Sequence, residues 1–146
     1  MSTQFNTTYF PEDIVRDGVG GCCHDFAFAL QQRTGWPLLV LWKQPVIDEY
    51  TLFFKPWPVH IALRAPNGQA VDVEGTHAID NLIDLYRVLK EGTITWDIYP
   101  NLDAYTVAMA GAEYGDVMLP RSHGNEAAEK VIAASPTFLA LIDTLR

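Results

Sequence analysis

Residues 59–74 read VHIALRAPNGQAVDVE. Apolar residues alternate with other types on both sides of Pro66-Asn67-Gly68, which is the pattern of two strands joined by a tight turn. Proline suits the second position of a type I turn, and glycine suits the left-handed residue that follows such a turn. The stretch therefore predicts two antiparallel strands, over residues 57–64 and 69–74, joined by a loop of residues 66–68.

The length of this loop decides which side chains share a face of the sheet. With Pro66-Asn67-Gly68 as a three-residue loop, Ala62 lies opposite Asp72, and His60 and Asp72 become diagonal neighbours on one face. A two-residue Asn-Gly loop would place them on opposite faces. We therefore expect His60 and Asp72 to interact. A purely structural pair is the alternative, because a buried histidine and aspartate need polar partners whatever their role.

The rest of the chain predicts an α+β fold in one domain over residues 1–146. The strands are grouped together, with helices before and after them, and this order favours an antiparallel sheet. Helices are expected over residues 11–17, 22–33, 79–90 and 102–112, from a cap at Asn125 to Ala134, and again from Ser135-Pro136. Further strands are expected over residues 38–42 and 93–99, and residues 44–56 fit a strand with a loop.

Residues 20–27 read GGCCHDFA and place a cysteine in the first turn of a predicted helix. Unpaired backbone N–H groups and the helix dipole favour a thiolate there, and the same N–H groups can donate to an oxyanion. Cys23 begins an apolar stripe that continues through Phe26, Ala27 and Leu30, so we expect Cys23, and not Cys22, to face the sheet. The alternative is that both cysteines are small core residues.

Together these patterns predict a nucleophile, a base and an orienting acid. Ala62 and Ala70 are small, so we expect the helix that carries Cys23 to pack on the face that holds His60 and Asp72. In nucleophilic catalysis a base takes the proton of the thiol, and a third group holds the base in the right tautomer. The sequence thus predicts Cys23 as nucleophile, His60 as base and Asp72 as the group that orients the histidine.

The same residues resemble a known family. Residues 21–27 resemble the Gly-x-Cys-x-Asp-Phe-Ala signature of the transglutaminase-like branch of the papain-like cysteine protease superfamily. His60-Ile61-Ala62 resembles that family's His-x-Ala strand, and residues 68–73, which end in Val-Asp-Val, resemble the strand that supplies its aspartate. The resemblance covers residues 18–75.

This resemblance implies a papain-like fold, with an N-terminal catalytic helix packed on an antiparallel sheet and additional C-terminal helices. It assigns catalysis to Cys23, His60 and Asp72, and it implies no cofactor. Activities in the family include peptide hydrolysis, deamidation of glutamine and acyl transfer to amines, so the expected partner is a peptide or protein substrate. It identifies no side chain for the oxyanion hole, for which Gln4, Asn6 and Tyr9 are distant candidates.

Several side chains outside the predicted triad are further candidates for a role in binding or stability. Residues 42–57 form an aromatic-rich segment. In it we expect Trp42 and Trp57 to contribute to substrate binding, with core packing as the alternative. Asp25 is expected to stabilise the start of its helix. His77 and His123 are expected at the surface without partners. A zinc site is not expected, because the adjacent cysteines lack the usual gap between ligands.

Composition and charge exclude several classes of function. The net charge of −8 leaves no basic surface for nucleic acid, and no apolar run is long enough for a membrane span. The N-terminal residues do not resemble a secretory signal, so we expect a cytoplasmic protein, although secretion by a route without a signal stays open. The two cysteines are adjacent, so we expect no disulfides. A catalytically inactive papain-like domain that binds proteins is the alternative function.

Overall fold

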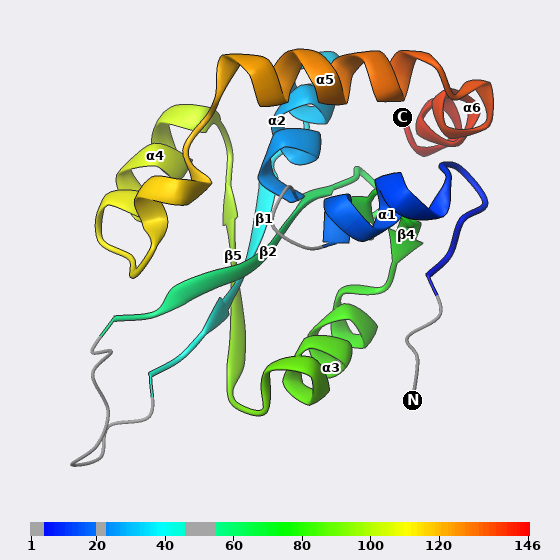
Figure 1. The fold of residues 1–146 in the computed structure, drawn as a ribbon. Helices are drawn as coiled ribbons and strands as arrows, with labels where there is room; N and C mark the ends of the chain where they lie inside the picture. The colour runs from blue at the N-terminus through cyan, green and yellow to red at the C-terminus, as the bar shows by residue number, and fades with distance from the viewer. Residues whose placement is uncertain (1–4, 20–22, 46–54) are drawn as a thin grey trace.

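The computed structural model describes residues 5–19, 23–45 and 55–146 (Figure 1). Within these residues, five strands form one antiparallel sheet in the order β4-β3-β2-β1-β5. The strands are β1 (Leu38–Lys43), β2 (Trp57–Arg64), β3 (Ala70–Asp72), β4 (Gly75–His77) and β5 (Ile94–Tyr99). The helices are α1 (Glu12–Val19), α2 (Cys23–Thr34), α3 (Ile79–Lys90), α4 (Leu102–Ala110), the short 3-10 helix η1 (Gly115–Met118), α5 (Ser122–Ala133) and α6 (Pro136–Leu145). The predicted α+β class is confirmed, and none of these helices is long and apolar enough to cross a membrane.

The register of the β2–β3 hairpin is the one that the sequence predicts. Leu63 pairs with Val71, and the backbone N–H of Ala65 donates to the carbonyl of Gln69 at 2.9 Å. Gly68 adopts the left-handed conformation, with a φ of +86°, that ends a loop of this kind. His60 and Asp72 therefore lie on one face, as expected.

The end of β3 differs from the prediction. The strand stops at Asp72, and the chain turns back through residues 73–74 into β4, which the sequence analysis did not predict. Gly75 makes this turn possible, because its φ is +108° and the ring of Tyr9 leaves no room for a Cβ atom. Because β3 is so short, it pairs with β2 only near Leu63 and Arg64, and the rest of that edge of β2 is not paired with it.

Helix α5 also begins earlier than predicted. It starts at Ser122, so Asn125 lies inside the helix and the predicted cap is wrong. Arg121 precedes the first residue and makes no capping side-chain hydrogen bond, but its guanidinium pairs with the carboxylate of Asp25 in α2. A contact between distant segments therefore fixes this end of the helix. Ser135 does cap α6, as predicted, by accepting from the N–H of Phe138 at 3.3 Å.

The two faces of the sheet are covered by different helices. Helix α2 packs on the face of Ile61 and Leu63, and its first two turns are buried on every side because α5 covers them. Helix α3 lies on the other face, away from α5 and α6 (Figure 1). There Ala62 and Ala70 pack beside side chains of α3, which are Leu82, Ile83 and Tyr86. The expectation that these alanines receive the helix of Cys23 is therefore wrong: the apolar face of β2 receives α2.

A bulge in β2 lies directly beside the predicted base. Leu41 of β1 pairs with His60, and the next residue, Trp42, pairs with Pro58, so Val59 is the extra residue. A bulge bends its strand and redirects the side chains next to it. It lies on the part of β2 that extends beyond β3, which is the part that the start of α2 approaches.

We expect Gly68→Val to lower the free energy of unfolding more than Gly68→Asn does, by roughly 1–2 kcal/mol, because asparagine tolerates a positive φ and valine does not. No atom lies within 4 Å of a Cβ placed at this position, so the difference reports backbone strain alone. Urea denaturation of the two variants measures it. Equal losses in both would show that the loop can adopt another conformation.

Candidate active site

Cys23 is the first residue of α2 and is almost fully buried, with 1% of its surface exposed. Cys22 and the glycines before it lie outside the described residues. The backbone of Ile61, on the part of β2 that β3 does not cover, is one of the groups that stabilise the Cys23 thiolate. Cys23 therefore reaches β2 beyond the end of β3, although the rest of α2 packs on the face opposite to His60.

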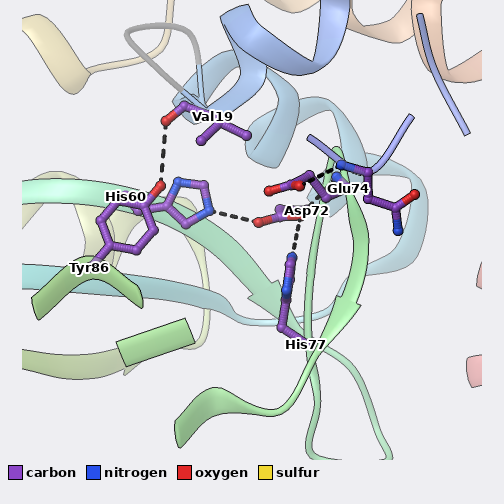
Figure 2. A network of polar contacts seen from close by, with 7 residues as sticks. Val19, His60, Asp72, Glu74, His77 and Tyr86 are labelled. Carbon is purple, nitrogen blue, oxygen red and sulfur yellow. Dashed lines mark hydrogen bonds and ion pairs between the residues drawn. The ribbon is translucent and has the colours of Figure 1, made fainter. Parts of the chain in front are cut away.

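His60 and Asp72 form the predicted pair (Figure 2). The distance from Nε2 of His60 to Oδ2 of Asp72 is 2.8 Å, and both side chains are buried. The other oxygen of Asp72 accepts from the backbone N–H of Glu74 at 2.9 Å and from Nε2 of His77 at 2.8 Å. Burial alone would raise the pKa of Asp72, but its hydrogen bonds to the two histidines outweigh burial and hold that pKa well below its usual range.

The bond to Asp72 determines what the other ring nitrogen of His60 can do. Because Nε2 donates to the carboxylate, Nδ1 of the neutral ring carries the lone pair and can accept a proton. Nδ1 is buried and, among the residues that the structure describes, has no hydrogen-bond partner. The nearby Cys23 thiol does not meet hydrogen-bond geometry with it here, and such catalytic contacts are often long before a substrate binds.

The cysteine and the histidine nevertheless influence each other strongly. Burial opposes the thiolate, but interactions with His24 and His60 outweigh it and lower the pKa of Cys23 to about 6. Burial also opposes the imidazolium, but the bond to Asp72 and the nearby Cys23 raise the pKa of His60 to about 10. Both shifts favour a thiolate–imidazolium pair at neutral pH, which is the reactive form of a cysteine nucleophile.

His77 corrects one prediction. It was expected at the surface without a partner, but it is half-buried and bonded to Asp72 (Figure 2). The pairing of β3 with β4 explains this position, because Asp72 lies opposite Gly75 and therefore diagonal to His77. The glycine that follows Val73-Glu74 was the signal for a second hairpin. His123 is exposed, as predicted.

Two tyrosines lie close to the predicted triad. The ring of Tyr86 stacks on the His60 ring, with centroids 4.9 Å apart, and its hydroxyl donates to the carbonyl of Val19 at 3.4 Å (Figure 2). The hydroxyl of Tyr105 donates to the carbonyl of Met118 at 2.6 Å. Burial, and then the charge of Cys23, raise the pKa of both tyrosines, so both hydroxyls stay protonated. Neither tyrosine was a candidate from sequence.

The predicted substrate-binding tryptophans lie in different hollows. Trp57 lines a hollow with Val19, Tyr86 and Met118. This hollow therefore borders the triad, because the ring of Tyr86 stacks on His60. Trp42 is buried and lines another hollow, which β5 and α4 border. Substrate binding stays a prediction for both side chains. The other aromatic residues of this segment, Tyr50, Phe53 and Phe54, lie outside the described residues.

Several remaining candidates can now be placed. Gln4 lies outside the described residues, the backbone N–H of Asn6 donates to Glu74, and the ring of Tyr9 packs against Phe138. Asp25 pairs with Arg121, which gives it a role in joining α2 to α5. Asp72, Glu74 and His77 could each offer a metal ion one ligand atom within a space of 4.8 Å, although Asp72 already accepts hydrogen bonds from the other two residues.

Comparison of the chain with protein-family models, with curated proteins and with solved structures found no match.

We expect alkylation of Cys23 by iodoacetamide to rise with pH around a midpoint near 6, because the thiolate is the reacting form. His60→Ala removes a group that lowers this pKa, so its midpoint should move up toward ~8.5 and its rate at pH 6.5 should fall roughly 10- to 100-fold. Mass spectrometry locates the label, and Cys22→Ser is the control that should leave the midpoint unchanged. A midpoint near 8.5 in the unsubstituted protein would contradict the activated thiol.

The second test concerns His77. Burial opposes the charged form of His77, but the interaction with Asp72 outweighs burial and raises the pKa of His77. The charged form therefore stabilises the fold fully below the unfolded pKa of ~6.5, and this contribution is lost as pH rises through the folded pKa. His77→Gln keeps a donor without the charge. We expect it to lower the free energy of unfolding by about 1–2 kcal/mol at pH 6, and by less at pH 10. His77→Leu should be destabilising at both values. Urea titrations measure this, and a loss in His77→Gln that does not change with pH would refute the charged pair.

Proposed function

We propose that this protein is a cysteine-dependent acyl-transfer enzyme that acts on an amide bond, as a peptidase, a glutamine deamidase or a transglutaminase. One observation carries the proposal: Asp72 holds Nε2 of His60 at 2.8 Å, which leaves Nδ1 as the proton acceptor beside Cys23. A thiol, a base and an acid that orients the base are the groups that this chemistry needs.

The reaction follows from these roles. Nδ1 of His60 takes the proton of Cys23, and the thiolate attacks the carbonyl carbon of the amide, whose oxygen becomes an oxyanion. His60 then gives the proton to the leaving amine or ammonia as the carbon–nitrogen bond breaks, and an acyl-thioester remains on Cys23. Water or an acceptor amine attacks the thioester and loses a proton to His60 as the new bond forms, and the carbon–sulfur bond then breaks to release the thiolate. No cofactor is needed for these steps.

The arrangement of elements supports a papain-like, transglutaminase-like fold. The helix that begins with the nucleophile precedes the sheet in the chain, and the histidine and the aspartate lie on the adjacent antiparallel strands β2 and β3. Additional helices follow the sheet. This order agrees with the motifs of residues 21–27, 60–62 and 68–73.

A peptide or protein substrate fits the surroundings of the triad. The hollow lined by Val19, Trp57 and Met118 is largely apolar and adjoins Tyr86, which stacks on His60. An apolar hollow with a few polar groups at its edge is typical of substrate sites. Trp57 is therefore the better supported of the two tryptophans for contact with the substrate.

A second candidate is a catalytically inactive domain of this fold that binds proteins. The observation that favours it is burial, because Cys23 and His60 are each only 1% exposed. A substrate can reach the sulfur only if the wall around it moves. The inactive domain requires no such movement, so reactivity toward an acyl donor separates the two functions.

To test the enzyme, we would mix the protein with p-nitrophenyl acetate and follow nitrophenolate release. We expect a burst equivalent to one acetyl group per chain, located on Cys23 by mass spectrometry, and no burst from Cys23→Ala. Asp72→Asn should slow the burst roughly 10²- to 10⁴-fold, because the histidine loses its orienting charge. Acetylation no faster than that of a small free thiol would favour the inactive domain.

If the burst is observed, a short peptide that contains glutamine identifies the reaction class. Ammonia release without an added amine indicates deamidation, and incorporation of an added amine indicates transglutamination. A new amino terminus indicates peptide hydrolysis.

A further inference from the structure

His24 directly follows the nucleophile, and its ring is buried. Its side chain is 2% exposed, and neither ring nitrogen has a hydrogen-bond partner among the residues that the structure describes. A buried polar group without a partner costs free energy, and such groups are rare in native proteins. The ring therefore requires an explanation that packing alone does not provide.

No described oxygen accepts a hydrogen bond of good geometry from the His24 ring. The ring of Phe28 meets it edge to face, with centroids 6.0 Å apart. Oδ1 of Asp25 lies 3.5 Å from Nε2, too far for a good hydrogen bond, and this carboxylate is already paired with Arg121. An imidazole always carries at least one N–H, so a donor without an oxygen acceptor remains here.

The side chain of His24 interacts with the sulfur of Cys23. Together with His60, it offsets the effect of burial on the thiol, and the two histidines lower the pKa of Cys23. His60 and His24 thus both act on Cys23, but Asp72 orients only the ring of His60. The two imidazoles are therefore suited to different tasks.

The proposed reaction needs a donor at this position. When the thiolate attacks, negative charge develops on an oxygen bound to the carbon that the sulfur has just joined, so the oxyanion lies close to the sulfur. Donors already in place for that oxygen are usually the largest single contribution to catalysis of this type. Backbone N–H groups at the start of α2 are one source, and sequence alone identified no side chain as a second.

The other polar side chains found to interact with Cys23 are already engaged. The hydroxyl of Tyr86 donates to Val19, and that of Tyr105 donates to Met118. Nδ1 of His60 has to receive the thiol proton. Among these groups, His24 alone has a ring N–H that no described oxygen accepts with good geometry. Its interaction with the sulfur weakens when the sulfur joins the substrate carbon and loses its charge.

We propose that His24 is a further catalytic residue, whose ring N–H donates a hydrogen bond to the oxyanion of the tetrahedral intermediate on Cys23. This inference rests on the proposed acyl transfer and adds to it the side chain of the oxyanion site. One of the two orphaned nitrogens is explained in the same way, because its partner exists only while substrate is bound.

Two reagents that attack the same sulfur separate this role from a general effect on the thiol. Iodoacetamide reacts by displacement and forms no oxyanion, whereas p-nitrophenyl acetate forms one. The ratio of the acetylation rate to the alkylation rate cancels changes in thiolate fraction and reduces the effect of changes in access. We would measure this ratio for the unsubstituted protein, His24→Gln and His24→Met. Glutamine and methionine are similar in length, but only glutamine has an N–H.

We expect His24→Met to lower the ratio about 10²-fold and His24→Gln to retain most of it, because one oxyanion donor is worth about this much. His123→Met, at an exposed histidine, is the control and should leave the ratio unchanged. Far-ultraviolet circular dichroism checks that each variant is folded. If methionine makes the protein unfold, the ratio for His24→Asn, which also carries an N–H, compared with His24→Leu gives the same test.

The outcomes are distinct. An unchanged ratio in His24→Met overturns the proposal, and so does an equal fall in His24→Met and His24→Gln, which would mean that His24 acts by packing. If the unsubstituted protein is acetylated no faster than a free thiol, the proposed acyl transfer fails and the role of His24 falls with it. If acetylation is fast but does not depend on the N–H at position 24, only the present inference fails.

Discussion

The carboxylate of Asp72 is the group on which the rest of this structure depends. It accepts from His60 across the β2–β3 ladder and from His77 across the β3–β4 ladder, each at 2.8 Å. Both histidines lie diagonal to it, one on each neighbouring strand and toward opposite ends of β3, so a three-residue strand can present Asp72 to both. A buried carboxylate is costly unless its oxygens are satisfied, and here two imidazoles and one backbone N–H satisfy it. The same bonds leave Nδ1 of His60 as the nitrogen that can accept a proton.

The shortness of β3 has a second consequence, because it decides where Cys23 can meet His60. Helix α2 packs on one face of the sheet, whereas His60 stacks on Tyr86 of α3 on the other face. A full-length β3 would cover the edge of β2 and separate the two side chains. Since β3 ends at Asp72, the start of α2 approaches β2 beyond that point, where the backbone of Ile61 helps to stabilise the Cys23 thiolate. The bulge at Val59 lies in the same segment and redirects the strand beside His60. A short strand and a bulge together allow groups from opposite faces to act on each other.

The features that sequence predicts correctly are those fixed by neighbouring residues. The loop Pro66-Asn67-Gly68 sets the register of β2 and β3, and with it the pairing of His60 and Asp72. The errors arise where distant segments decide the outcome. Gly75 turns the chain toward His77 with a positive φ, under the ring of the distant Tyr9, and α5 begins at Ser122 where Asp25 holds Arg121. The face on which α2 packs depends on the apolar area of both partners, which alternation within a single strand does not reveal. Orphaned nitrogens such as those of His24 have no signature in sequence at all.

The burial that makes the thiol reactive also closes it to substrate. Desolvation by itself would keep Cys23 protonated, and the two imidazoles, with the backbone of Ile61, reverse this effect. Charges in a buried site interact more strongly than they would in water, so the residues that bury Cys23 and His60 also strengthen the attraction between the thiolate and the imidazolium. Two tyrosines are part of that wall, and their anchors differ: Tyr105 donates to Met118 at 2.6 Å, whereas Tyr86 donates to Val19 at 3.4 Å. The second bond is long and therefore weak, and it borders the hollow that Trp57 lines. Judged by these two hydrogen bonds alone, the Tyr86–Val19 contact is easier to displace than the Tyr105–Met118 contact, so we expect the side that faces Trp57 to be the easier approach to the sulfur.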